Sequence, residues 1–453
     1  MPTTMMTTTE RGLVLVGLPW AQRLRALLRY AVLAPSNHNA QPWKVRIDDN
    51  VLELFPDRSR STPVVDPDDR QLAISCGAFL FHLRVAARHF GWDTKITLLP
   101  RMEPPPVLQL GVDRAVARVV FFDQEEFDQH SERLFQAIPA RRTWRLRFAD
   151  AVVDDVAVAR LCSAVAVEGA HLKIVTDQRR RRALASMVAN ADEAQWSDGA
   201  FRQELAAWCH PGGGDRRDGL PGQSLGQGDI VSFVAPLIVR TFDLGASRAA
   251  HDEELARGSP LLAVIVTDGD GEVDWLTAGQ ALDRLLLTAA SEGLAASFLN
   301  QCIEVPVLRR CVADLLGTTG APQILLRIGR PQGRTPMPTP RRPVEEFILE
   351  PGSIFEAKRR GVFNDAADVR RSIDDLRAHM HVAAAEGQEQ WRHAQARFQE
   401  LQRVLRKLEA RAAEPLVELL SSAEGLIKDV RTALEKLRPH RGGSAHVQDA
   451  PAS

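Results

Sequence analysis

The decapeptide at residues 34–43, Ala-Pro-Ser-Asn-His-Asn-Ala-Gln-Pro-Trp, gathers hydroxyl, amide and imidazole side chains between two prolines. Prolines restrict the backbone and interrupt helices, so we expect an irregular turn here. Such a turn can present polar side chains and backbone N–H groups to a flat polar ligand. The alternative is an ordinary helix-to-strand turn with Trp43 in the core, and the decapeptide alone does not separate the two.

A second segment, Arg141-Arg142-Thr143-Trp144-Arg145, combines three guanidinium groups with a hydroxyl. Arginine can donate two parallel N–H bonds to a phosphate or a carboxylate, so the segment predicts an anion site. A solvated basic face is the alternative, because that is the usual role of neighbouring charges. The tryptophan within the segment favours a packed site.

Both segments resemble the flavin-binding nitroreductase superfamily, in which segments of the form APSxxNxQPW and RRSxR build an FMN site. Further similarity lies at residues 291–294 with 299–301, and at residues 326–331 with 339–343. The resemblance covers roughly residues 20–350. It implies an α+β fold and a bound FMN, with NAD(P)H as the reductant.

The order of the two segments differs from that of the family. A typical subunit carries the arginine segment first, and two subunits share each FMN. Here the order is reversed, and each half has its own central apolar helix, at residues 71–90 and 278–292. The resemblance therefore implies two nitroreductase-like halves, residues 19–128 and 129–352, which form a pseudo-dimer by internal duplication, with one composite FMN site.

The resemblance also implies the residues that hold the cofactor. They are Ser36, Asn37, Asn39, Arg141, Arg142, Thr143, Arg145, Arg330 and Arg341. Arg141, Arg142 and Thr143 are expected to hold the phosphate. Arg145 is expected at the N1/C2=O edge of the flavin, where positive charge tunes the cofactor's potential. The three decapeptide residues should contact the ring from the other half, and the last two arginines are weaker phosphate candidates. No catalytic side chain and no metal ligand are expected, because flavin N5 carries the chemistry.

The elements that must position these segments alternate between helices and strands, which indicates α+β architecture. Helices are expected at residues 23–33, 71–90, 132–138, 156–165, 180–192, 278–292 and 305–316. Strands are expected at residues 44–47, 51–55, 95–99, 116–122, 171–175, 261–267, 273–276, 297–300 and 322–328.

A stretch rich in Gly, Asp and Arg, at residues 199–229, predicts a long loop-rich excursion, and we expect a lid at about residues 192–230. Trp208 and the sequence Arg-Asp-Gly-Leu-Pro at residues 217–221 resemble the Acg-type branch of the superfamily, which has a tryptophan-containing lid.

Beyond residue 355, glycine and proline become sparse and apolar residues recur at alternating steps of three and four. This heptad pattern predicts an amphipathic, coiled-coil-like helical module over residues 355–440. Most of its apolar positions are expected to form the module's own core, and self-association or a protein partner is the minority interpretation. Residues 1–18 and 441–453 are expected to be a disordered leader and tail.

Composition limits the class of protein. Lys and Arg total 57 against 58 Asp and Glu, a net charge of −1, which argues against a nucleic-acid partner. The five cysteines are scattered without a C-x-x-C pair, which argues against a disulfide scaffold or a zinc ribbon. No apolar run is long enough to span a membrane. We expect a cytoplasmic protein without a membrane partner.

Two functions follow from the resemblance, and a third follows from the helical module. The first is an FMN-dependent oxidoreductase, which passes hydride from NAD(P)H through flavin N5 to a small-molecule electron acceptor such as a nitroaromatic or a quinone. If the lid covers the ring, the alternative is a non-catalytic FMN-binding protein for sequestration or storage. The third is an interaction protein that acts through the helical tail.

Overall fold

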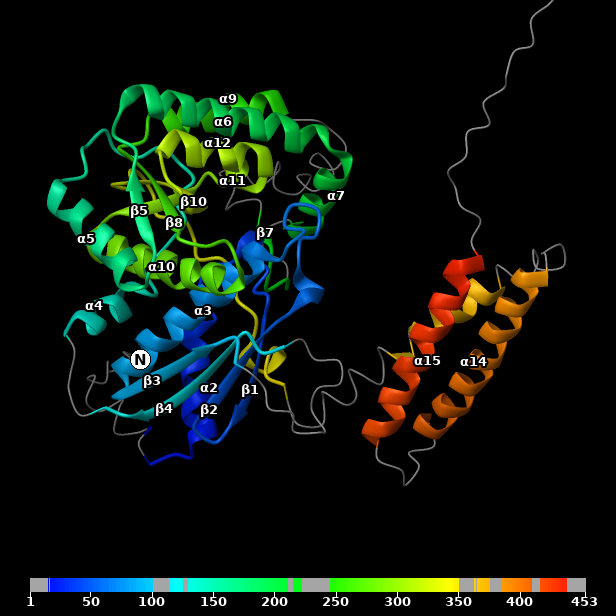
Figure 1. Cartoon of the computed structure of the whole chain (residues 1–453). Helices are drawn as coiled ribbons and strands as arrows, with labels where there is room; N and C mark the ends of the chain where they lie inside the picture. Colours follow the sequence, from blue (N-terminus) through cyan, green and yellow to red (C-terminus); the bar gives the residue numbers. More distant parts are fainter. Residues whose placement is uncertain are drawn as a thin grey trace, which may run out of the picture. The chain divides into compact units, whose positions relative to one another are not determined.

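A computed structural model describes residues 15, 17–100, 114–124, 129–210, 215–221, 245–349, 362–363, 365–374, 385–409 and 416–437. They belong to two compact units: one holds the described residues up to Ile348, and the other holds those from Leu349 onward. The first unit mixes helices with antiparallel sheets, which confirms the α+β class (Figure 1).

The first sheet of this unit has the strand order β1-β2-β4-β3 and is antiparallel throughout. Its strands are β1 (Trp43–Asp48), β2 (Val51–Pro56), β3 (Trp92–Leu98) and β4 (Ala117–Asp123). Strands β1 and β2 form the predicted hairpin. Helix α2 (Trp20–Ala31) packs against this sheet with an apolar stripe at helical spacing. The stripe comprises Leu24, Leu27, Leu28 and Ala31.

The second sheet repeats this topology. Its strands are β5 (His171–Ile174), β8 (Leu261–Thr267), β9 (Ala295–Phe298) and β10 (Ala321–Gly329). Their order is β5-β8-β10-β9, so in both sheets the fourth strand lies between the second and the third. One long helix joins the second strand to the third in each case: α3 (Arg70–His89) in the first sheet and α10 (Glu272–Ser291) in the second.

Helices cover both faces of the second sheet, which explains why β8 is apolar at nearly every position. Leu262 and Val264 face one core, whereas Ala263 and Ile265 face the other, because successive side chains of a strand point to opposite faces. The other α-helices in the described part of the unit are α4 (Gln129–Ala137), α5 (Asp155–Val167), α6 (Gln178–Ser197), α7 (Gly199–Trp208), α9 (Gly245–Arg257), α11 (Gln301–Glu304) and α12 (Pro306–Leu316).

The two central helices cross in backbone contact at a pair of glycines. A Cβ on Gly77 of α3 would lie 2.2 Å from the carbonyl oxygen of Leu276, and a Cβ on Gly279 of α10 would lie 2.1 Å from that of Ile74. Neither position has room for a side chain. The same helices are also joined by the fully buried pair His82 and Asp283.

One predicted strand is wrong. Residues 273–276 were expected to extend as a strand after a hairpin turn, but they form the first turn of α10. The cause is local capping: the backbone N–H of Gly271 donates to the Asp274 carboxylate at 2.9 Å, and acidic residues stabilise a helix N-terminus.

The expected loop at residues 199–229 is also partly wrong, because its first residues form α7. Asp198 caps this helix by accepting a hydrogen bond from the Ala200 N–H at 2.8 Å. A two-stranded pairing follows, between β6 (Cys209–His210) and β7 (Leu220–Pro221). The rest of this stretch, residues 211–214 and 222–229, lies outside the described residues.

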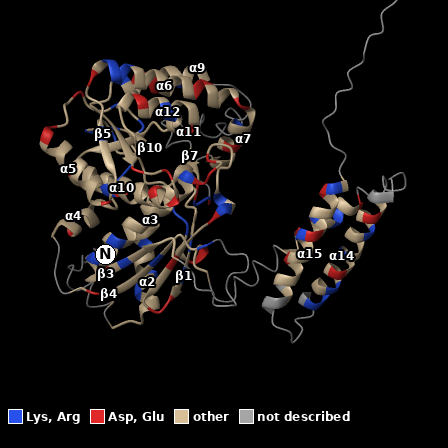
Figure 2. Cartoon of the chain, in the orientation of Figure 1, with Lys and Arg blue, Asp and Glu red and all other residues tan. Residues whose placement is uncertain are grey.

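The second unit contains helices at residues 365–374, α14 (Ala385–Glu409) and α15 (Leu416–Leu437). The region is helical, as the heptads predict, and its buried apolar residues form a core of their own; they include Val369, Ile373, Ala394, Leu401, Ala423, Ile427, Val430 and Leu434. Basic and acidic residues are interspersed along α14 and α15 (Figure 2).

The disorder expected for residues 1–18 and 441–453 lies outside the described residues, apart from Leu15, Gly17 and Leu18. Among the described helices, none combines the length and the apolar character that a bilayer crossing requires.

The helix crossing predicts a steep cost for any side chain at its centre. We expect Gly77→Ala or Gly279→Ala to lower the free energy of unfolding by about 1–3 kcal/mol, because an overpacked site must shift backbone. The matched control is Gly199→Ala in the same unit, where the nearest atom, a flexible Arg202 guanidinium nitrogen, is 3.8 Å away. Urea denaturation measures the three variants, and equal stabilities would contradict the crossing.

Candidate functional site

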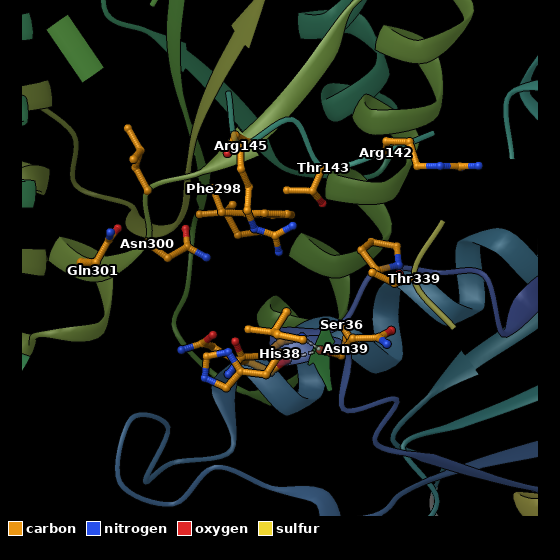
Figure 3. A pocket seen from close by; sticks show the side chains of 18 of the residues that line it. Ser36, His38, Asn39, Arg142, Thr143, Arg145, Phe298, Asn300, Gln301 and Thr339 are labelled. Atoms are coloured by element: carbon orange, nitrogen blue, oxygen red, sulfur yellow. Dashed lines mark hydrogen bonds between the residues drawn. The ribbon is translucent and has the colours of Figure 1, made fainter. Parts of the chain in front are cut away.

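A cavity of about 620 Å³ lies in the first unit, and residues of both halves line it (Figure 3). Eight of the nine residues expected to bind a cofactor are in its wall: Ser36, Asn37, Asn39, Arg141, Arg142, Thr143, Arg145 and Arg341. Arg330 is not in the wall. It follows the last residue of β10, and its side chain is exposed. The structure thus brings together two segments about a hundred residues apart.

The decapeptide folds into a turn with an unusual backbone. His38, Asn39 and Gln41 have φ angles of 47°, 55° and 52°, in the left-handed region that costs L-residues about 1–2 kcal/mol each. Local hydrogen bonds hold the turn: the Ser36 hydroxyl accepts from the Gln41 N–H at 2.9 Å, and the Asn37 amide donates to Thr62 Oγ1 at 3.2 Å.

Segments of the second half also fix the turn. The Asn39 amide nitrogen donates to the carbonyl oxygens of Gly219, at 3.2 Å, and Pro340, at 3.1 Å. Fully buried Gln41 donates to the carbonyl of Arg217 at 2.9 Å and accepts from the Arg342 N–H at 2.8 Å. The amide nitrogen of Asn39 is therefore already engaged by protein carbonyls.

Three guanidinium groups gather at one end of the cavity, those of Arg141, Arg142 and Arg341. Among the described residues none of them has a carboxylate within 4.0 Å, and the buried Nε atoms of Arg141 and Arg142 have no hydrogen-bond partner. Burial, and then Arg141 and Arg142, lower the pKa of Arg341 to about 9. Cations buried without counter-charges favour an anionic ligand.

Arg142 already donates through one terminal nitrogen to the carbonyls of Pro139 and Arg141, both at 2.7 Å. Arg341 makes more hydrogen bonds to the protein than either neighbour. Its Nε donates to the carbonyl of Val32 at 2.9 Å, and its other nitrogens reach carbonyls of Leu33, Thr339 and Pro340. Arg341 thus ties the chain segment before Arg342 to the end of α2. It contributes charge to the cluster, while Arg141 keeps its donors.

Arg145 is held in place by a residue that the sequence analysis missed, Arg327 of β10. Arg327 is 1% exposed, and its two terminal nitrogens donate to the carbonyls of Trp144 and Leu146, both at 2.9 Å. These carbonyls bracket Arg145, so Arg327 fixes the backbone from which Arg145 reaches the cavity. The signal was visible as one arginine in the run of apolar residues at 324–328.

Burial shifts the pKa values of Arg145 and His38 and so sets their protonation states. Burial, and then Arg248, lower the pKa of Arg145 to about 10, so it stays protonated at neutral pH. Burial, and then Arg145, lower the pKa of His38 to about 4, so this imidazole is neutral. In Figure 3, His38 lies on the opposite side of the cavity from Arg145.

The far end of the cavity is acidic, which the sequence analysis also missed. Burial, and then Asp252, raise the pKa of Asp192 to about 7. The Gln301 amide donates to Asp252 at 2.8 Å and reaches Asp192 at 3.5 Å. Burial also raises the pKa of Glu304, which accepts hydrogen bonds from Gln71 and Gln195. These acids lie on three helices, 50 to 60 residues apart in the sequence, so no local motif marks them.

The segment between β5 and β8, called the excursion from here on, contains α6, α7 and α9 and is hydrogen-bonded to the first half. Glu204 of α7 accepts from the backbone N–H groups of Val64 and Val65, at 2.9 and 3.1 Å. Asp218 pairs with Arg60 and Arg216, whose hydrogen bonds lower its pKa although burial opposes them. Side chains of the excursion line the cavity; they are Trp196, Phe201, Leu205 and Leu220. Within the described part of the chain, no three His, Cys, Asp or Glu residues are grouped to hold a metal ion.

No family model matches the chain, but individual curated proteins are similar to it over most of their length. It is 32% identical over 344 residues to "Putative NAD(P)H nitroreductase Rv3131" of Mycobacterium tuberculosis strain H37Rv, covering 75% of this chain and 95% of the relative. It is 30% identical over 331 residues to "Putative NAD(P)H nitroreductase acg" of the same strain, covering 72% and 95%.

Among solved structures, the FMN and NADPH-dependent nitroreductase NfnB from sphigopyxis sp. strain HMH aligns with a TM-score of 0.33 at 22% identity, over 48% of this chain and 98% of that one. The geometry defines a two-sheet α+β protein with an arginine-lined cavity to which both halves contribute. By its curated relatives, this chain belongs to the nitroreductase-like family that includes Acg.

The arginine cluster predicts recognition of a phosphate rather than of a ring. We expect Arg141→Gln to weaken FMN binding by about 1.5–3 kcal/mol, the range for a hydrogen bond to a charged group, and to leave riboflavin binding unchanged. Riboflavin carries the same ring without the phosphate. Fluorescence titration measures both ligands.

Two further variants make this test specific. Arg142→Ala should act in the same direction, and it serves where Arg141→Gln fails to fold. Arg310→Gln, at an exposed position of α12 outside the cavity wall, is the control. An equal loss for FMN and riboflavin would reject the phosphate assignment.

Proposed function

We propose that this protein is an FMN-dependent oxidoreductase of the nitroreductase type, which takes reducing equivalents from NAD(P)H and reduces a small nitroaromatic or quinone-like acceptor. The observation that carries the proposal is the meeting of the decapeptide turn and the arginine segment in one cavity. The names of the curated relatives support the reaction class.

The residues of the cavity fit FMN. The orphaned donors of Arg141 and Arg142 suit its phosphate, with Thr143 adding a hydroxyl. Arg145 supplies a fixed positive charge, and Ser36 and Asn37 supply polar groups from the turn. When bound, the flavin supplies the hydride chemistry.

The contributions of the chain itself are binding, charge and exclusion of water. Protonated Arg145 favours reduction of a flavin held beside it, because reduction adds negative charge to the ring. Trp196, Phe201 and Leu205 give the cavity an apolar wall, which strengthens these electrostatic interactions. Neutral His38 adds no competing charge.

We also propose that one chain does the work of a nitroreductase dimer, with residues 19–128 and 129–352 as the two subunit equivalents. The common strand order of the two sheets supports this proposal, as does the glycine pair at which α3 and α10 cross. In this arrangement each half contributes one of the two segments of the site.

A second candidate function is FMN sequestration without turnover. It is favoured by the contacts that hold the excursion to the first half, in which Glu204 accepts hydrogen bonds from two backbone N–H groups and Asp218 pairs with Arg60. If these contacts keep a bound ring covered, NAD(P)H cannot reach it. An interaction role through the helical tail remains the third alternative, and it predicts a partner that is lost on deleting residues 355–453 while FMN binding is unchanged.

A visible spectrum of the purified protein, recorded anaerobically with NADH and then NADPH, separates the first two functions. We expect an FMN band that bleaches with one of the nicotinamides and returns when a nitroaromatic or a quinone is added. A band that persists with both nicotinamides but bleaches with dithionite would support sequestration. The absence of FMN after reconstitution would reject both functions.

Because Arg327 positions the backbone of Arg145, a substitution of Arg327 should change the midpoint potential of a bound flavin. Arg327→Lys keeps the charge but cannot bridge two carbonyls, so we expect a more negative flavin midpoint potential as Arg145 loses its fixed position. Stability should fall by about 1.5–3 kcal/mol for the buried charge-assisted bond that is lost. Arg160→Lys, at an exposed ion pair, is the control. A stability loss with an unchanged potential would make Arg327 purely structural.

A further inference from the structure

One guanidinium group in the cavity wall is used by neither the phosphate cluster nor the segment around Arg145. It belongs to Arg248 of α9 and lies 6.0 Å from the ring centre of Trp196. The wall of α6, α7 and α9 combines apolar side chains with polar ones; the apolar ones are Phe201, Leu205 and Leu255, and the polar ones include Asp192, His251 and Asp252. Apolar side chains beside a cation suit an aromatic ring that carries a negative charge.

Arg248 makes no direct ion pair with a described residue. Among the described residues it has no hydrogen bond and no carboxylate within 4.0 Å. The acidic groups nearest in the wall, Asp192 and Asp252, are held by Gln301. Burial, and then Asp252, raise the pKa of Asp192 to about 7, whereas Arg248 lowers it by less, so this carboxyl is a neighbour of Arg248 without forming a direct ion pair with it.

A second positive charge reinforces the first. Arg248 is close enough to Arg145 to lower its pKa, after the larger effect of burial. The two guanidinium groups repel each other inside a cavity, and an anion between or beside them relieves that repulsion. This region differs from the phosphate cluster: in Figure 3 Arg142 and Gln301 lie at opposite ends, with Arg145 and Phe298 between them.

We propose that Arg248 binds the carboxylate of the acceptor, so that the substrates of this protein are aromatic acids bearing a nitro or quinone group. The inference rests on the proposed function. The interaction is a non-covalent charge-assisted hydrogen bond, with the ring of the acid packed against Trp196 and Phe201. The excursion that carries α6, α7 and α9 is then a specificity element as well as a cover.

The test compares 4-nitrobenzoate with 4-nitrobenzamide, its near-isosteric neutral analogue. Calorimetric titration of oxidised, FMN-loaded protein without nicotinamide measures binding directly. We expect the benzoate to bind about tenfold more tightly, or better, which is the scale of one charge-assisted bond. Arg248→Gln should remove this preference, Arg248→Lys should keep part of it, and Arg310→Gln should leave it unchanged. The FMN content of all four proteins, from flavin absorbance, should be equal.

Other outcomes overturn the proposal in identifiable ways. Equal binding of the two ligands by the unaltered protein rejects an anionic subsite, and FMN loading then shows that the proposed function still stands. If Arg248→Gln lowers FMN content instead, Arg248 holds the cofactor. If it weakens the binding of NADP⁺ but not that of nitrobenzoate, Arg248 holds a phosphate of the dinucleotide. If the unaltered protein loads no FMN, the proposed function fails, and the calorimetric preference on the same sample still decides whether Arg248 selects carboxylates.

Discussion

The backbone contact between α3 and α10 is the constraint on which the rest of the structure depends. Gly77 and Gly279 meet with no space for a side chain, so the two helices have one separation and one crossing geometry. Both helices also line the cavity, through Ile74 and Leu282 among others. Because each half is built around its helix, this contact sets how the decapeptide turn faces the arginine segment.

The cavity is arranged for binding rather than for stability. The buried Nε atoms of Arg141 and Arg142 have no hydrogen-bond partner, and the turn at residues 38–41 holds three left-handed residues. Both features cost free energy in the free protein. The surrounding structure offsets that cost through contacts that do not face a ligand, such as the Gln41 bonds to residues 217 and 342 and the Arg327 bridge. The donors thereby stay directed into the cavity.

Local sequence patterns were enough to predict some elements of the structure and misled at others. The apolar stripe of α2 and the β1–β2 hairpin follow from periodicity and turn residues, and both form as predicted. Residues 273–276 mislead because a short apolar run suits a strand or a helix equally, and the Gly271–Asp274 cap decides. Arg330 and Arg341 look equivalent in sequence. In the structure the Arg330 side chain is exposed, whereas Arg341 donates to a backbone carbonyl at the end of α2.

By itself the sequence determined the family and the chemical types at the site, because the decapeptide and the arginine segment are contiguous and can be recognised locally. Only the tertiary structure decided which residues meet. It joined the two segments in one cavity, engaged the Asn39 amide, and added Arg248, Asp192 and Arg327 from distant elements. The physical reason is that contact and desolvation depend on packing between helices far apart in the chain, and no short pattern of residues records that packing.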